Sequence, residues 1–226
     1  MARPTITLGD LDPATHMVLA DKLTRAKDGR ETVHIKGAPV PLVQLGVDQN
    51  DMMRSVYGLD DAYPQPEVEA TDEQGTSAST NVASKKERVM RCLIQPQYEG
   101  VYRNMDEHVK TEVGNKVRGW YGKAKKLEVK SFIVETPDGP AVKVKVNPDT
   151  TAIYEVSDDN KASKASIESL VPGCECLVLV EMKSLWIRDQ NQCGIVMRAR
   201  TILVKPGNGN AYGIDSMILA PGLDFE

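Results

Sequence analysis

The sequence CLVLVEMKSLWI at residues 176–187 is followed closely by GIVMRARTILVK at residues 194–205. Both runs are rich in Val, Ile and Leu, which favour the pleated and half-buried surface of a β-sheet. The polar residues RDQNQ at 188–192 lie between them and suit the turn of a hairpin. We therefore predict one long β-hairpin at the centre of a β-rich fold.

Shorter strands are predicted upstream of this hairpin, separated by turn sequences such as GAP at 37–39 and TPDGP at 136–140. They cover residues 32–36, 40–45, 89–95, 129–135, 141–147 and 151–156. Strands and helices do not alternate along the chain, so a parallel sheet is not expected. This pattern predicts a mostly β protein with an antiparallel barrel.

Two helices are predicted beside the strands. The first and shorter one covers residues 14–26, with Asp12 as N-cap and Pro13 in the first turn. The second is an amphipathic helix inserted between strands, and Gly114 and Gly119 bracket its exit. Its apolar residues recur every three or four positions, at Tyr98, Val101, Tyr102, Met105, Val109 and Val113.

The chain is predicted to form a single domain over residues 1–226, with an acidic disordered insertion at 60–84 and a short tail at 206–226. About sixty residues precede the insertion, too few to build a core of their own. No apolar run reaches the roughly 20 residues that cross a bilayer, and the N-terminus lacks a secretion signal. We expect an intracellular protein without a membrane partner.

Charge is unevenly distributed along the chain, although the net charge is −4. Residues 48–73 hold eight acidic residues and one basic residue, whereas residues 85–145 hold fourteen basic and eight acidic residues. Residues 182–205 hold five basic residues and one acidic residue. A basic body of this kind is typical of proteins that bind nucleic acid. We expect the acidic insertion either to compete with DNA for the basic body or to act only as a solubilising loop.

Catalytic and metal-binding motifs are not evident. The sequence has no Gly-rich phosphate loop, HExxH or GxSxG motif, and Asp158 and Asp159 fall in a polar turn. Cys174 and Cys176 are too closely spaced for a zinc knuckle, and the chain has only two further cysteines. We therefore predict a protein that is not an enzyme, needs no cofactor or metal, and buries its cysteines among its strands.

Strand alternation predicts a basic strip. In VKVKV at 142–146 the valines point to one face and Lys143 and Lys145 to the other, and Arg198 and Arg200 likewise share a face. Two such strands side by side could follow a phosphate backbone. The alternative is that these cations belong to the solvated outer faces of antiparallel strands.

A second basic cluster, KVRGWYGKAKK at residues 116–126, surrounds two adjacent aromatic residues. Aromatic faces stack on unpaired bases while nearby cations hold phosphates. Trp120 could instead dock the helix on the core, which leaves Tyr121 and the cations as the better candidates for DNA contact. The candidates in this cluster are Lys116, Arg118, Tyr121, Lys123, Lys125 and Lys126, and further along the chain they are Tyr154, Trp186 and Arg188.

The order of these features resembles the single-stranded-DNA-binding proteins of large eukaryotic (nucleo-cytoplasmic) DNA viruses, which are similar to the replication single-strand-binding protein of short-tailed phages. The resemblance covers residues 88–205 and has a weaker counterpart at 41–44. It rests on spaced hydrophobic, glycine and aromatic residues in RCLIQP at 91–96, VY at 101–102, WYGK at 120–123, VKVKV at 142–146, LVPG at 170–173, LWI at 185–187 and the run 194–204.

The resemblance implies an OB-like barrel with an inserted helix, no cofactor, and non-sequence-specific protection of single-stranded DNA in replication, recombination or repair. It also implies a replication polymerase or helicase as partner through the C-terminal tail, and a homo-oligomer is possible. The tail here, LDFE at 223–226, keeps the aromatic residue Phe225 but has little acid. A viral protein of this kind would work in the host nucleus or at a cytoplasmic replication site. A virion structural or scaffold protein, and an accessory factor that binds proteins, are the alternative functions.

Overall fold

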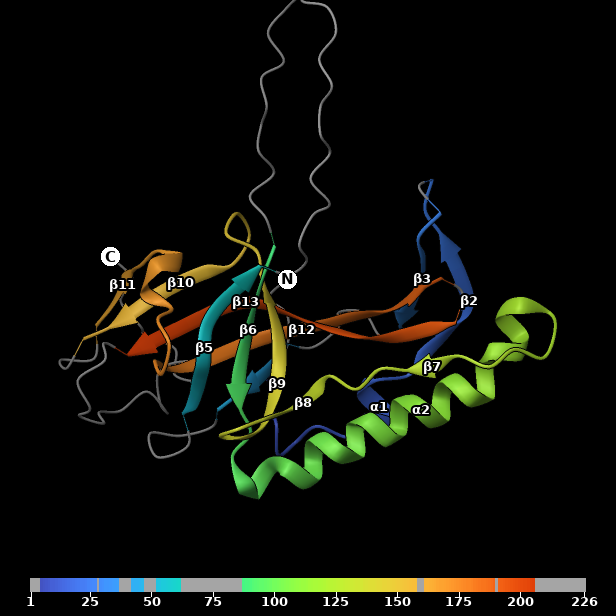
Figure 1. Cartoon of the computed structure of the whole chain (residues 1–226), viewed down its shortest axis with the longest axis horizontal. Coiled ribbons are helices and arrows are strands. Elements are labelled where there is room, and N and C mark those ends of the chain that lie inside the picture. Colours follow the sequence, from blue (N-terminus) through green and yellow to red (C-terminus); the bar gives the residue numbers. More distant parts are fainter. Residues whose placement is uncertain are drawn as a thin grey trace, which may run out of the picture.

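The computed structural model describes residues 5–27, 29–36, 42–46, 52–61, 87–157, 161–189 and 191–205. Thirteen strands dominate it, and one long helix, α2 (Glu99–Tyr121), runs along one side (Figure 1). The short helices are α1 (Pro13–His16), η1 (Pro96–Tyr98) and η2 (Ile167–Ser169). The strands are β1 (Thr5–Thr7), β2 (Leu19–Arg25), β3 (Glu31–Ile35), β4 (Leu42–Leu45), β5 (Met53–Asp61), β6 (Arg88–Leu93), β7 (Glu128–Val129), β8 (Ile133–Thr136), β9 (Gly139–Val146), β10 (Ala152–Val156), β11 (Ala162–Lys164), β12 (Glu175–Arg188) and β13 (Gln192–Lys205).

Five strands close into a barrel. Antiparallel pairing joins β12 to β5, β5 to β6, and β6 to β9. The ring continues from β9 to β13 through a parallel pairing and returns from β13 to β12 as the long hairpin. Numbered along the chain, the barrel strands follow the order 1-2-3-5-4. This closed five-stranded barrel confirms the OB-like fold class.

The hairpin of β12 and β13 extends beyond the barrel at both ends. One half of β12 pairs with β3, whose partner β2 completes an upright hairpin on the right of Figure 1. At the other end, β13 pairs with β10, and β10 pairs with β11. The register shift between Leu179 and Val180 leaves Arg200 as an extra residue in β13, and the shift between Met182 and Leu185 leaves an extra residue in β12. Bulges bend a strand, which allows one strand to serve both the barrel and its extensions.

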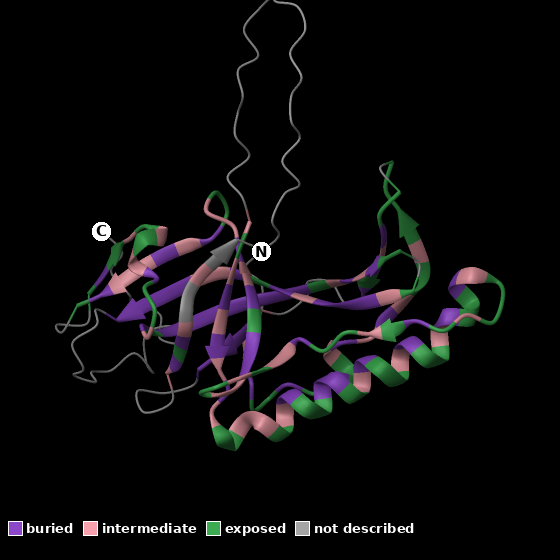
Figure 2. Cartoon of the chain, viewed as in Figure 1, coloured by how far each residue is buried: buried purple, intermediate pink, exposed green. Residues whose placement is uncertain are grey.

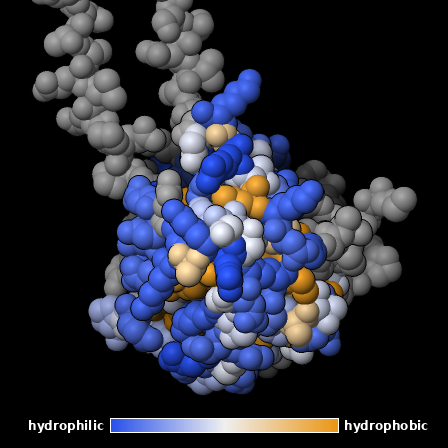
Figure 3. All heavy atoms as spheres, turned by 90° about the vertical axis from the view of Figure 1, so that its right-hand side faces the viewer, coloured by the Kyte–Doolittle hydropathy of each residue, from blue (hydrophilic) through white to orange (hydrophobic). Residues whose placement is uncertain are grey.

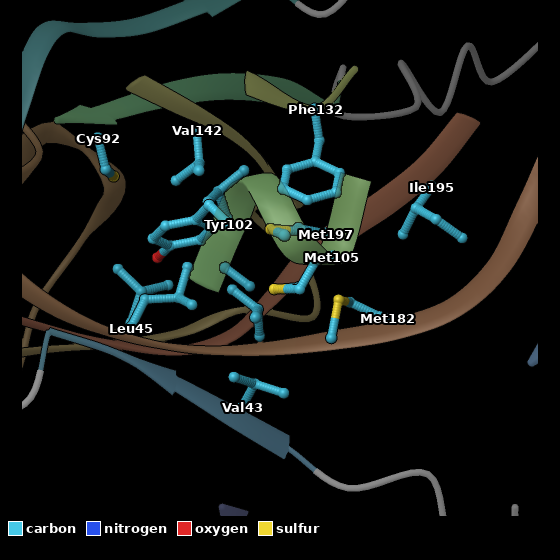
Figure 4. Close-up of a cluster of buried hydrophobic side chains, with 14 of the residues drawn as sticks. Val43, Leu45, Cys92, Tyr102, Met105, Phe132, Val142, Met182, Ile195 and Met197 are labelled. Atoms are coloured by element: carbon cyan, nitrogen blue, oxygen red, sulfur yellow. The ribbon is translucent and has the colours of Figure 1, made fainter. Parts of the chain in front are cut away.

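The core lies between the barrel and α2, and buried positions form a stripe along the helix that faces the sheet (Figure 2). Tyr102 and Met105 from α2 point into the barrel among Met197, Val142 and Phe132 (Figure 4). The rings of Tyr102 and Phe132 meet edge to face with centroids 6.4 Å apart. All four cysteines are buried free thiols.

Several predicted elements need correction. The first helix covers only Pro13–His16, and residues 19–25, expected to be helical, form β2. Met17, Leu19 and Leu23 lie at odd-numbered positions, so they also fit the period of two of a strand, and pairing with β3 decides in favour of the strand. The helix α2 continues through Gly114 and Gly119 and ends at Gly122, whose φ of 66° suits glycine.

Other boundaries also differ from prediction. The strands β3 and β4 both pair with β12 rather than forming a hairpin with each other, and the predicted strand 129–135 is divided into β7 and β8. The turn at 37–39, the acidic insertion beyond Asp61 and the tail at 206–226 lie outside the described residues. Among the helices described, none has the length and apolar character needed to span a membrane.

Candidate nucleic-acid interface

Two adjoining hollows lie on the outer surface of the barrel, above the hairpin of β12 and β13. Their volumes are about 480 and 560 Å³, and Lys145, Trp186 and Val196 line both. The wall formed by β6 and β9 stands on one side, and the start of β3 stands on the other (Figure 1). We call the two hollows together the groove. Residues from both walls and from the floor face a shared, solvent-open channel.

Strand alternation positions the cations of this groove. Along β9 the valines at 142, 144 and 146 are buried, whereas Lys143 is exposed and Lys145 is half-buried. Lys143 is paired in register with Arg91 on β6, and Lys145 with Arg198 on β13. Three neighbouring strands therefore contribute two cross-strand pairs of cations to one surface.

Positive charge exceeds negative charge in the groove. The cationic residues that line it are Arg30, Arg91, Lys130, Lys143, Lys145, Arg188 and Arg198, and the acidic ones are Glu31, Glu87 and Asp189. All three of these acidic residues lie in the hollow next to β3, and the charged residues among the described lining of the hollow next to β6 are all cations. Burial lowers the pKa of Lys143, and the charge of Arg91 lowers that pKa further.

Trp186 lies on the floor where the two hollows meet, and it is half-buried. Its cross-strand partner is Gly194 on β13. A Cβ atom at position 194 would lie only 3.0 Å from Cζ2 of Trp186 and 3.1 Å from the carbonyl oxygen of Lys130. The absence of a side chain at Gly194 therefore lets the indole ring lie close against the sheet, in a fixed position within the groove.

Two predicted site residues on other parts of the sheet lie outside the groove. Arg200 does not line the groove, because its guanidinium donates hydrogen bonds to the carboxylate of buried Glu181, with Nε 2.9 Å from Oε2. Tyr154 on β10 packs against the small apolar cluster of Val156, Leu177 and Leu203. The four cations of the predicted strip are thus reduced to three in the groove.

The basic cluster at 116–126 does not line the groove either. Lys116 fastens α2 to β2: its ammonium donates to the backbone oxygen of Leu19 and lies 3.2 Å from the carboxylate of Asp21. Trp120 is buried, and its indole N–H donates to the backbone oxygen of Ala20 at 3.0 Å. Trp120 therefore anchors the helix to the sheet. This is the second of the two roles that the sequence allowed, the first being base stacking.

The remaining members of that cluster surround the end of α2. Arg118, Lys123 and Lys126 are exposed, and the ammonium of Lys125 lies 3.7 Å from the ring centroid of Tyr121. The hydroxyl of Tyr121 donates to the carboxylate of Glu31 at 2.5 Å. Both the ring and the hydroxyl of Tyr121 thus have partners within the protein.

Glu31 connects this helix end to the groove wall. Burial alone would raise the pKa of its carboxyl, but hydrogen bonds from Tyr121 and Arg25 outweigh burial and lower the pKa. Burial raises the pKa of Tyr121, and the hydrogen bond to Glu31 and the charge of Glu31 raise it further. Glu31 therefore stays ionised and holds the β2–β3 hairpin against α2.

The groove contains cations that the sequence reasoning missed. Arg91 and Lys130 line the hollow next to β6. A signal for Arg91 was available, because it alternates with buried Met90 and Cys92 on a strand that was predicted. Lys130 follows the two-residue strand β7, which is too short to give a periodic signal. In the described part of the chain, no cluster of three or more His, Cys, Asp or Glu residues could hold a metal ion.

The face of the molecule on the right of Figure 1 is mainly hydrophilic, with hydrophobic residues visible in small patches between the polar ones (Figure 3). This view includes the β2–β3 end of the molecule, beside which the groove begins. Of the large hydrophobic side chains in the described residues, Val171 is the one that is exposed. The described surface therefore offers charge and small apolar patches rather than a broad apolar face.

Comparison with known proteins finds similar folds but no sequence family. No protein-family model and no curated protein matches the chain. The single-stranded DNA-binding protein from bacteriophage Enc34, solved in complex with single-stranded DNA, is 11% identical with a TM-score of 0.42, over 88% of this chain and 99% of that chain. The single-stranded DNA-binding protein gp2.5 of bacteriophage T7 is 11% identical with a TM-score of 0.35, over 76% and 91%.

Both of these structures are of single-stranded-DNA-binding proteins from phages. At these identities and TM-scores the likeness does not assign a function to this chain. The resemblance to proteins of large eukaryotic DNA viruses stays a prediction.

Proposed function

We propose that the chain binds single-stranded DNA without sequence specificity and protects it during replication, recombination or repair. The observation that carries this proposal is the groove, in which cations from β6, β9 and β13 flank the half-buried ring of Trp186. Cations can follow a phosphate backbone, and an indole ring can stack on an unpaired base.

The position of the groove on the barrel also supports this function. In OB folds the face of the second and third barrel strands, with the loops next to it, is the usual site for oligonucleotides. Here those strands are β6 and β9, which carry Arg91, Lys143 and Lys145. Cations and an indole ring in this position can contact phosphates and stack on bases. Phosphate contact and stacking are therefore the favoured modes, and both tolerate any sequence.

The finer parts of the proposal rest on the sequence resemblance. We infer a viral protein that acts by binding rather than catalysis, at a nuclear or cytoplasmic replication site. We also infer contact with a replication polymerase or helicase through Phe225, and self-association. Phe225 lies outside the described residues.

A titration tests the proposed function directly. The chain is titrated into labelled oligo-dT and into duplex DNA of equal length, at several salt concentrations. We expect preference for the single strand, with affinity that falls as salt rises. Removing Lys143 and Lys145 together by alanine substitution should reduce the slope of log K against log salt by about 0.7 for each phosphate that the variant no longer neutralises.

The matched control is Lys164→Ala on β11, an exposed cation at the opposite end of the molecule. It removes the same kind of charge and should leave the affinity for oligo-dT unchanged. Equal binding of the duplex and the single strand, or equal affinities for the groove variant and the wild type, would count against the proposal.

A further inference from the structure

The acidic residue Glu87 contacts two cations of the groove. Its carboxylate oxygen Oε2 lies 2.7 Å from Nζ of Lys145, and Oε1 lies 3.6 Å from a terminal nitrogen of Arg198. Lys145 and Arg198 come from different strands and are paired in register across β9 and β13. One carboxylate therefore bridges two cations that the sheet places side by side.

Two cations that hold a carboxylate in this way can also hold a phosphate. Carboxylate and phosphate groups both accept hydrogen bonds through their oxygens from the ammonium of Lys and the guanidinium of Arg. The Glu87 side chain and that of Lys145 are each about a quarter exposed, whereas Arg198 is more than half exposed. The pair can thus be reached from solvent when Glu87 moves aside.

Lys143 lies next to this pair of cations, on the same strand β9. Lys143, in register with Arg91, has no ion pair with a carboxylate among the described residues. Lys143 and Lys145 are two residues apart on β9, which places them about 6.6 Å apart along the strand. This spacing suits consecutive phosphates of an extended strand, and the position at Lys145 contains the protein's own anion, Glu87.

We propose that Lys145 and Arg198 form a subsite for one backbone phosphate, and that Glu87 occupies it until the strand displaces the carboxylate. This inference rests on the proposed function and identifies a residue that tunes it. Because Lys145 and Arg198 exchange one anion for another, the wild type gains less from this contact than two free cations would provide. Glu87 therefore weakens binding and makes it less dependent on salt.

The variant Glu87→Gln tests the subsite in the full chain, with oligo-dT as the probe. Without the competing charge, affinity at low salt should rise about 3- to 10-fold, as expected for the loss of two partly exposed ion pairs. The slope of log K against log salt should also steepen by about 0.7, because one more phosphate contact now releases counterions. A purely structural role for Glu87 would not steepen this slope.

Two further variants sharpen the test. Glu107→Gln removes the same charge from α2, where Glu107 pairs with Lys110 at 2.5 Å, and should change neither affinity nor slope. Adding Arg198→Ala to Glu87→Gln should abolish most of the gain. If Glu87→Gln folds poorly in thermal unfolding, Glu87→Asp, which keeps the charge but shortens its reach by one methylene, should give part of the gain.

The outcomes separate the two proposals. Failure of the wild type to bind oligo-dT would overturn the proposed function. Wild-type binding without any gain in affinity or slope for the Glu87 variants would overturn this inference alone.

Discussion

Replacing Gly194 by alanine should damage the groove without adding or removing a charge. The new Cβ would lie 3.0 Å from Cζ2 and 3.1 Å from Cε2 of Trp186, and 3.1 Å from the carbonyl oxygen of Lys130. The Lys130 segment is held in place, because its backbone N–H donates to the oxygen of Cys193 at 2.7 Å. The indole ring must therefore move more than the backbone.

Two effects of this movement can be estimated separately. Forcing a methyl group into a packed site costs about 1–3 kcal/mol of stability. Loss of one base stack on Trp186 costs about 1–3 kcal/mol of binding, which corresponds to a roughly 5- to 150-fold lower affinity for single-stranded DNA. The stability effect is measured by urea unfolding, and the binding effect by titration at a temperature where the variant is folded.

The assay compares oligo-dT with an abasic oligonucleotide of the same length, which keeps the phosphates but has no bases to stack. Gly194→Ala and Trp186→Ala should both lower the affinity for oligo-dT and leave that for the abasic strand nearly unchanged. Gly114→Ala serves as control, because a Cβ there meets nothing within 4 Å. Wild-type affinity of Gly194→Ala for oligo-dT, or an equal loss with both strands, would refute the stacking role of Trp186.

Two further predictions concern the surroundings of the groove. Tyr121→Phe removes the hydrogen bond to Glu31 and should lower stability by about 1.5–3 kcal/mol near neutral pH. Because the folded state lowers the pKa of Glu31 from 4.5, this stabilisation is present above that pH and is lost as pH falls below it, so the variant and the wild type should converge in acid unfolding. All four cysteines are buried free thiols, and burial raises the pKa of Cys193 to about 12. Because the reagent cannot reach buried sulfur atoms, the four thiols should resist Ellman's reagent at pH 8 and react once urea unfolds the chain; rapid reaction of the native protein would contradict the buried positions.

Local patterns in the sequence were sufficient for the main elements. The apolar runs at 176–187 and 194–205 predicted the hairpin of β12 and β13, and the spacing of three and four residues predicted α2. Alternation along β9 placed Lys143 and Lys145 on the outer face of the barrel. These features depend on residues that are close together in the sequence, so local sequence patterns are enough to predict them.

Other features depended on which strands meet. The segment 19–25 satisfies both a helical and a strand pattern, and it became β2 because β3 is available for pairing. Arg198 and Arg200 are two residues apart in the sequence, yet Arg198 lies beside Lys145 in the groove, whereas Arg200 lies at a register shift in β13 and is paired with buried Glu181. Alternation in the sequence predicts which face of a strand a side chain lies on, but it does not predict which side chain of the neighbouring strand lies next to it.

The chain therefore encodes locally a mostly β protein with a long hairpin, an amphipathic helix and outward-pointing cations. The closure of five strands into a barrel and the placing of Glu87 between Lys145 and Arg198 arise from contacts between distant segments. So does the close approach of Trp186 to Gly194. The physical reason is that side-chain period is a property of one strand, whereas register and ion pairing are properties of two strands brought together by the fold.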